Sequence, residues 1–181
     1  MMHDRKIEEH WFGVARLTVP VPSFDGFQAR YEAAVPAIPR ESVTRLVAQK
    51  APWPEMLELI EASAPHGFLI YFRNDVHPVM ALAGDKALCA SYLMGNHTIA
   101  ERMFRHDPRA MLYAPLHTVI WEDAAGDAWF TVDQPSTQFA SFEIPEISTV
   151  GVELDRKLAT LCDALEIPVA ESLRNHAGEA E

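Results

Sequence analysis

The stretch Leu-His-Thr-Val-Ile-Trp-Glu-Asp-Ala-Ala-Gly-Asp-Ala-Trp-Phe-Thr-Val, residues 116–132, decides the fold class of this chain. Its two ends, 116–122 and 128–132, are rich in β-branched and aromatic residues, and a short acidic loop around Gly126 joins them. Two strand-forming runs separated by a short loop with glycine are typical of a β-hairpin. The chain therefore contains an antiparallel pair of strands.

The first strand of this hairpin has two mixed faces. His117, Val119 and Trp121 share one face because successive side chains of a strand alternate. A mixture of polar and apolar residues is typical of a wet pocket or of a partly covered dimer surface. It is also explained by ordinary cross-strand packing with one aromatic face turned inward.

Helical periodicity flanks the hairpin on both sides. Apolar residues follow one helical face over 24–34, after an N-cap at Ser23, and recur every three or four positions over 147–165, where Pro168 closes the pattern. The second pattern predicts a long C-terminal helix across a sheet. Two extra N-terminal helices are expected. One holds Val43, Leu46 and Val47, and the other begins near Pro54 with Met56, Leu57 and Ile60 facing inward.

Further strands are expected between the helices. Residues 12–21 predict a first strand, the continuous apolar run 68–72 predicts a central strand, and 87–94 predict another. A short helix over 79–83 ends at Gly84. Thr98 and Glu101 have the spacing of a capping box, so a helix is expected from there to near His106. The fold class is thus α+β, with an antiparallel or mixed sheet.

Composition fits one globular domain. The chain has 181 residues, of which 49% are hydrophobic and 23% charged, so disordered and fibrous classes are excluded. We expect a polar N-terminal segment over 1–11, a single α+β domain over 12–168 and a mobile C-terminal tail over 169–181.

Charge and hydropathy restrict the partners. The formal net charge of −11 disfavours nucleic acid and anionic membranes. No apolar stretch reaches the roughly 20 residues that a membrane span needs, and the first residues have no apolar signal region. Two cysteines, Cys89 and Cys162, make no disulfide framework and are expected to be buried thiols. A cytoplasmic location follows, with neither nucleic acid nor membrane as a partner.

The segment 68–136 carries an ordered set of short motifs. They are Asp75-Val76-His77, Leu93-Met94-Gly95-Asn96, His106-Asp107-Pro108, Tyr113-Ala114-Pro115-Leu116, Trp121-Glu122-Asp123 and Val132-Asp133-Gln134-Pro135. In this order they resemble the bacterial family called domain of unknown function 302 (DUF 302), although His97 stands where that family has a proline. The resemblance implies a compact fold in the style of TATA-binding-protein-like sheets, with helices packed on one face, and often a homodimer. It implies no reaction.

Asp75 and His77 form the first candidate pair. They lie two positions apart at the end of a strand, so a strand that continued through them would place both side chains, and Tyr71, on one face. A carboxylate beside an imidazole can orient a general base or supply two metal ligands. In the alternative interpretation, Asp75 caps the next helix and His77 packs near Pro78.

The turn at Gly95 and Asn96 gives a second candidate. Free backbone N–H groups at a helix start bind carboxylates or phosphates, although the same turn is an ordinary way to begin a helix. His97 and Glu101, four residues apart, are weak candidates for metal ligands, because no third ligand is fixed by spacing. A solvated helix surface explains them as well.

These features lead to a main hypothesis and two rivals. The main hypothesis is a homodimer that binds a partly apolar small molecule near Tyr71, Asp75, His77 and Asn96. The first rival is an enzyme that uses Asp75 and His77 as an acid–base pair, or histidines and acids as a metal site. The second is a structural or interaction module without a ligand. The sequence assigns no cofactor.

Overall fold

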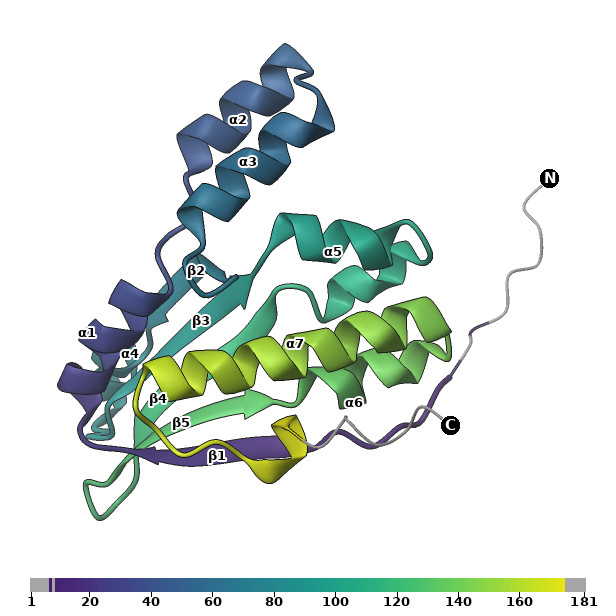
Figure 1. The fold of residues 1–181 in the computed structure, drawn as a ribbon. Helices are drawn as coiled ribbons and strands as arrows, with labels where there is room; N and C mark the ends of the chain where they lie inside the picture. Colours follow the sequence, from purple (N-terminus) through teal and green to yellow (C-terminus); the bar gives the residue numbers. More distant parts are fainter. Residues whose placement is uncertain (1–6, 8, 175–181) are drawn as a thin grey trace.

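The structure, a computed structural model, describes residue 7 and residues 9–174. Its centre is a five-stranded antiparallel sheet in the order β1-β5-β4-β3-β2 (Figure 1). The strands are β1 Arg16–Val21, β2 Leu69–Asp75, β3 Cys89–Gly95, β4 Leu116–Glu122 and β5 Ala128–Asp133. The predicted hairpin is confirmed as β4 and β5, in which Trp121 lies opposite Trp129.

Seven α-helices and four short 3-10 turns complete the α+β fold in the described part of the chain. The helices are α1 Phe24–Ala34, α2 Arg40–Gln49, α3 Trp53–Ser63, α4 His77–Met80, α5 His97–Phe104, α6 Pro135–Phe139 and α7 Pro145–Ala164. The 3-10 turns are η1 Ala81–Ala83, η2 Pro108–Leu112, η3 Ala140–Phe142 and η4 Glu171–Leu173. None of the described helices is long and apolar enough to cross a membrane.

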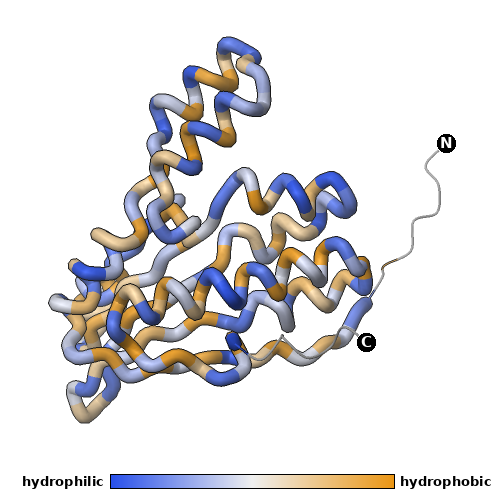
Figure 2. The backbone as a smooth tube through the Cα atoms, viewed as in Figure 1, coloured by the Kyte–Doolittle hydropathy of each residue, from blue (hydrophilic) through white to orange (hydrophobic). Residues whose placement is uncertain are grey.

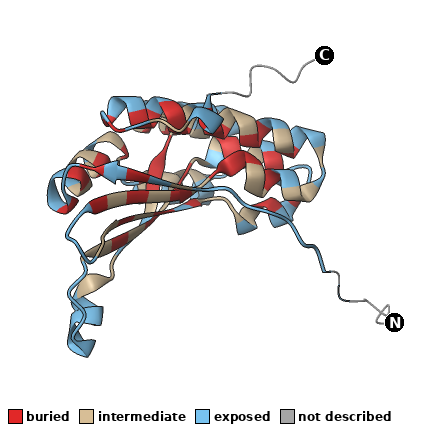
Figure 3. Cartoon of the chain, turned by 90° about the horizontal axis from the view of Figure 1, so that it is seen from below, coloured by how far each residue is buried: buried red, intermediate tan, exposed pale blue. Residues whose placement is uncertain are grey.

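Most of the helices gather on one side of the sheet, and the core lies between them and the strands (Figure 3), whereas α4 stands apart from this layer and has no buried residue. In β4, Leu116, Thr118 and Ile120 are buried under this layer, whereas His117 is exposed and Val119 is half-buried on the opposite face. Trp121 lies on that uncovered face as well. Cross-strand packing does turn one aromatic residue of the hairpin inward, since Phe130 is buried, whereas alternation turns Trp121 away from the helices.

The two amphipathic helices have the burial that their periodicity predicts. Phe24, Phe27 and Tyr31 of α1 are buried, and in α7 the buried positions repeat along one side over nearly its whole length. Figure 2 shows the matching alternation of hydrophobic and hydrophilic segments along α7. Ser23 is the N-cap residue of α1, but its side chain makes no capping hydrogen bond.

β2 is an edge strand, so the expectation of a central strand over 68–72 is wrong. Its outer edge is covered by the segment before α2: Ile38 N donates to Ile70 O at 3.0 Å, and Ile70 N donates to Pro36 O at 2.8 Å. A small separate core of Ile38, Ile60, Ala64 and Leu69 packs there. This cover explains why an edge strand is as apolar as a central one.

The α2–α3 hairpin projects away from the rest of the fold (Figure 1). No residue of α2 is buried. In α3, Ile60 is buried and Met56 packs half-buried against the small core, as predicted, whereas Leu57 is 40% exposed, so its predicted inward orientation is wrong. One contact of this hairpin with the rest of the fold runs through Ile60, with Val43 and Met56 beside it, in the small core next to β2.

Smaller differences concern element ends. β1 begins at Arg16 and not at residue 12, and the helix predicted over 79–83 divides into α4 and η1 before Gly84. In the predicted tail, Leu173 of η4 is buried. Residues 1–6, 8 and 175–181, which belong to the predicted polar segment and tail, lie outside the described residues.

Candidate functional site

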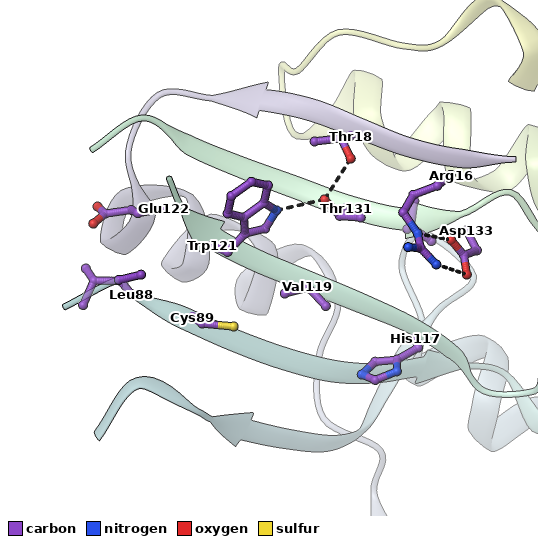
Figure 4. A pocket seen from close by; sticks show the side chains of 12 residues that line it. Arg16, Thr18, Leu88, Cys89, His117, Val119, Trp121, Glu122, Thr131 and Asp133 are labelled. Atoms are coloured by element: carbon purple, nitrogen blue, oxygen red, sulfur yellow. Dashed lines mark hydrogen bonds and ion pairs between the residues drawn. The ribbon is translucent and has the colours of Figure 1, made fainter. Parts of the chain in front are cut away.

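The uncovered face of the sheet carries a hollow of about 520 Å³, here called the sheet hollow (Figure 4). Strands β1, β3, β4 and β5 supply its floor, together with the segment just before β3. The floor brings together residues that are more than 100 positions apart, as in the pair Arg16 and Asp133. Such a surface forms only when all four strands are in register.

Trp121 and two threonines form the centre of the sheet hollow. The indole Nε1 of Trp121 donates to Thr131 Oγ1 at 2.9 Å, and the hydroxyls of Thr18 and Thr131 lie 3.1 Å apart. The Trp121 ring also stacks on Trp129, with centroids 6.3 Å apart and planes at 26°. The hydrogen bond to Thr131, drawn in Figure 4, and the stacking on Trp129 together hold this large ring on the open face.

Charged groups lie around this aromatic centre. Arg16 and Asp133 form a bidentate pair, with Nε and Nη2 at 2.7 and 3.2 Å from the carboxylate oxygens. The hydrogen bond to Asp133 raises the pKa of Arg16. Glu122 forms no ion pair with another described residue, so the hollow has one unbalanced negative charge.

The sheet hollow has no evident catalytic pair. Burial raises the pKa of the Cys89 thiol, so it stays protonated and is a poor nucleophile at neutral pH. His117 and Glu122 lie at opposite ends of β4 (Figure 4), about 17 Å apart along an extended strand. The arrangement suits binding better than proton transfer.

Tyr71 and His97 pack together on the helix side of β2. Their rings meet edge to face at a centroid distance of 4.8 Å. The Tyr71 hydroxyl is buried and makes no hydrogen bond with a described residue, and burial raises its pKa to about 12. Burial also lowers the pKa of His97. Tyr71 is therefore mainly a packing residue of the small core beside β2.

Asp75 belongs to a polar cluster between β2 and α1. Arg73 holds its carboxylate at 3.0 and 3.1 Å, and Gln28 Nε2 lies 3.4 Å away. The Tyr92 hydroxyl donates to Glu32 at 2.8 Å in the same cluster, which Arg73 also contacts. These partners give Asp75 a structural role in joining α1 to the sheet edge.

His77 lies at the first position of α4, beyond the end of β2. Its Nδ1 is 3.4 Å from the Cys89 carbonyl oxygen, and its ring meets Phe24 edge to face at 6.0 Å. Asp75 and His77 therefore have separate partners, and no hydrogen bond joins them in the described part of the chain. Their predicted pairing needs the strand to continue, but β2 ends at Asp75.

Asn96 lies at the other end of β3 and caps α5. Its Oδ1 accepts from Thr98 N at 2.9 Å and from Ile99 N at 3.4 Å, so the cap is Asn96 and the predicted capping box from Thr98 to Glu101 is wrong. Its Nδ2 donates to Gly67 O at 3.0 Å. Asn96 borders a second hollow of about 570 Å³ between α3, α5 and α7, here called the α5 hollow.

The four residues predicted as ligand contacts thus form two pairs, which lie at opposite ends of the β2–β3 strand pair. Tyr71 and Asn96 are near the start of α5, and Asp75 and His77 are near α4. Their role in ligand binding stays a prediction. The weak metal candidates are not supported by a ligand set: Glu101 is bound by Arg105 Nε at 3.1 Å, and the described residues contain no group of three metal-binding side chains.

Sequence reasoning identified part of the sheet hollow, since the face of His117, Val119 and Trp121 was expected to mark a wet pocket or a dimer surface. It did not identify the groups that β1 and β5 add. Arg16, Thr18 and Thr131 stand in predicted strands, and Asp133 directly follows one. Strand parity places Arg16 with Thr18 on one face, and Thr131 with Asp133 on one face. Their alignment across β1 and β5 depends on register, which no local pattern specifies.

Comparison with known proteins adds a family but no chemistry. A family model described as domain of unknown function DUF302 matches residues 48–165. A crystal structure of an uncharacterized conserved DUF302 protein from Bacillus stearothermophilus is similar, with a TM-score of 0.58 and 12% identity, over 84% of this chain and 97% of that chain. No curated protein matches the chain.

Proposed function

The chain belongs to the DUF302 family, and from this premise we propose that it binds a flat, partly apolar small molecule in the sheet hollow. The observation that carries the proposal is Trp121, a large ring held on the open face of the sheet by Thr131 and Trp129. An aromatic surface beside a few fixed polar groups is the usual composition of a small-molecule site.

The charges around the hollow narrow the ligand class. Arg16 is neutralised by Asp133, whereas Glu122 has no cationic partner among the described residues. Trp121 offers a π-face that attracts cations. A neutral or singly cationic aromatic molecule therefore fits better than an anion.

The proposal includes a homodimer in the cytoplasm. The family resemblance supports the dimer, as do exposed apolar side chains on the helical side: Val47 is 67% exposed, Trp53 42% and Phe104 50%. The two free cysteines, Cys89 and Cys162, suit a reducing compartment.

The enzyme alternative has less support. Asp75 is held by Arg73, and His77 packs against Phe24. An acid–base pair requires the two side chains to be within hydrogen-bond reach of each other or of a common substrate atom. A catalytic metal would require further ligands that no described cluster supplies.

Native mass spectrometry with elemental analysis of the freshly purified protein is the first test. We expect a dimer that carries a defined extra mass of a small aromatic compound. A stoichiometric metal that is lost in His77→Ala would instead support the enzyme. A bare metal-free protein that also binds no aromatic probe would support a structural module.

A variant pair then tests the position of the site. We expect Trp121→Ala to bind thioflavin T, a flat aromatic cation, about tenfold more weakly, because the aromatic surface is lost. Trp11→Ala, at an exposed tryptophan that does not line the sheet hollow, is the matched control and should bind as the wild type does. Equal binding by Trp121→Ala would place the ligand elsewhere.

A further inference from the structure

The α5 hollow has a cation on one wall and apolar side chains beside it. Lys157 of α7 is half-buried there, and Leu57, Pro65 and Ile99 supply apolar surface. This hollow is separate from the sheet hollow, because α3, α5 and α7 lie on the helix side of the sheet (Figure 1).

Lys157 has no carboxylate partner within the described residues. Glu153, one helical turn earlier on α7, is the usual position for such a partner. Arg102 of α5 already holds Glu153 with two short bonds, of 2.6 and 2.8 Å. The Arg102 hydrogen bond is also the main cause of the lowered pKa of Glu153. Glu153 still attracts Lys157 electrostatically, but its carboxylate oxygens are hydrogen-bonded to Arg102, so the Lys157 ammonium keeps its hydrogen-bond donors for the hollow.

The loop before β2 is shaped to receive this lysine. Gly67 has a φ of +78°, and a Cβ atom at this position would lie 3.1 Å from Lys157 Nζ. A side chain here would therefore be strained and would also crowd the ammonium. The Gly67 carbonyl is tied to Asn96 at 3.0 Å, which fixes the loop relative to α5.

Apart from His66, the other polar groups of the hollow leave Lys157 as the principal donor. The Thr98 hydroxyl donates to Asn96 Oδ1 at 2.7 Å, and the Thr160 hydroxyl donates to the Arg156 carbonyl at 3.0 Å. The Thr98 backbone N–H is taken by the same Asn96 oxygen. The helix start therefore does not supply the anion contact, and the lysine must.

Charge restricts the class of anion. Glu61 also lines the hollow, and its carboxylate offsets the charge of the Lys157 ammonium. A balanced site favours a monoanion over a phosphate dianion. From these contacts we propose that the α5 hollow binds a small organic carboxylate, with its carboxylate on Lys157 and its apolar part against Leu57 and Ile99.

The test is a titration of the full-length protein with butyrate, benzoate and inorganic phosphate, followed by backbone amide NMR. We expect saturable shifts of Gly67, Asn96 and Thr98 with the carboxylates, and weaker or no shifts with phosphate. Tighter binding of phosphate than of either carboxylate would overturn the assignment, as would carboxylate shifts that avoid these residues.

Variants separate the site from general effects. Lys157→Met keeps the apolar stem and should bind the carboxylates about tenfold more weakly, because a charge-assisted hydrogen bond is lost. Lys86→Met, at an exposed lysine outside the hollow, is the control and should bind normally. Lys157→Gln serves if the methionine variant is poorly folded. Unchanged binding in a folded Lys157 variant would refute the proposal. Trp121→Ala should leave carboxylate binding intact, so the two proposed sites fail independently.

Discussion

Trp121 Nε1 and Thr131 Oγ1, on neighbouring strands, are joined by a hydrogen bond of 2.9 Å on the face of the sheet that the helices leave uncovered. Tryptophan has a single hydrogen-bond donor, and this one is used to fix the ring on the sheet. The aromatic surface of the sheet hollow is therefore preorganised before any ligand arrives.

Thr131→Val should weaken binding at this surface. The change preserves the shape of the side chain but leaves the Trp121 indole without its acceptor, so the ring loses its restraint. We expect thioflavin T to bind several-fold more weakly, as measured by fluorescence titration. In Thr18→Val the hydrogen bond of Trp121 remains, and binding should change less. Equal losses in both variants would show that the ring is not held by Thr131.

Asp155→Ala should strongly destabilise the fold. Asp155 is fully buried in α7, where it accepts from Gln134 Nε2 at 2.7 Å and from Ser136 N at 2.9 Å. Its removal leaves two buried donors without this acceptor, which costs about 2–4 kcal/mol of unfolding free energy. Urea denaturation measures the loss.

Asp163→Ala is the control on the same helix. Asp163 pairs with Arg174 at 2.8 Å, but both side chains are more than half exposed. A pair of this kind contributes less than about 1 kcal/mol. If both alanine variants had similar unfolding midpoints, burial would not be the reason for the importance of Asp155.

Gly151→Ala tests the close contact between α6 and α7. A Cβ atom at Gly151 would lie 3.0 Å from the Phe139 Cβ atom and 3.1 Å from the Ser136 Cα atom. Alanine gains up to about 1 kcal/mol of helix propensity, whereas crowding against backbone costs about 1–3 kcal/mol. We expect net destabilisation, read as a lower urea midpoint. A more stable variant would show that α6 can move away at little cost.

An element could be predicted from the sequence when the pattern that specifies it lies within a few neighbouring residues. The β4–β5 hairpin and α7 are encoded by patterns within a few residues, and both were predicted with nearly correct bounds. The position of β2 within the sheet was predicted wrongly, because an apolar run is expected in a central strand and β2 lies at the edge. Here Ile38 and Ile60, from segments outside the strand, bury that run at an edge.

The site was harder to predict than the fold. Asp75 and His77 were paired by parity, which holds only while a strand continues, and β2 ends between them. The hollow around Trp121 depends on the register of four strands. A residue such as Arg16 carries no local sign of its contact with Asp133, 117 positions later.

His97 should make stability depend on pH between neutral and mildly acidic conditions. Its ring is packed against Tyr71, and burial lowers its pKa from the ordinary value of 6.5. Below that value the unfolded chain binds a proton that the folded protein does not, so stability falls as the pH decreases toward the folded pKa. Above pH 6.5 the His97 ring is neutral in both the folded and the unfolded protein, so its packing against Tyr71 stabilises the fold fully.

The measurement compares urea midpoints at pH 7.5 and pH 5.5 for the wild type, His97→Gln and His106→Gln. His106 is exposed and serves as the control. The His97 variant should lose less stability on acidification than the wild type, because glutamine does not titrate, while the His106 variant should follow the wild type. If the His97 variant lost as much stability on acidification as the wild type does, the His97 ring would be able to accept a proton in the folded protein without leaving Tyr71.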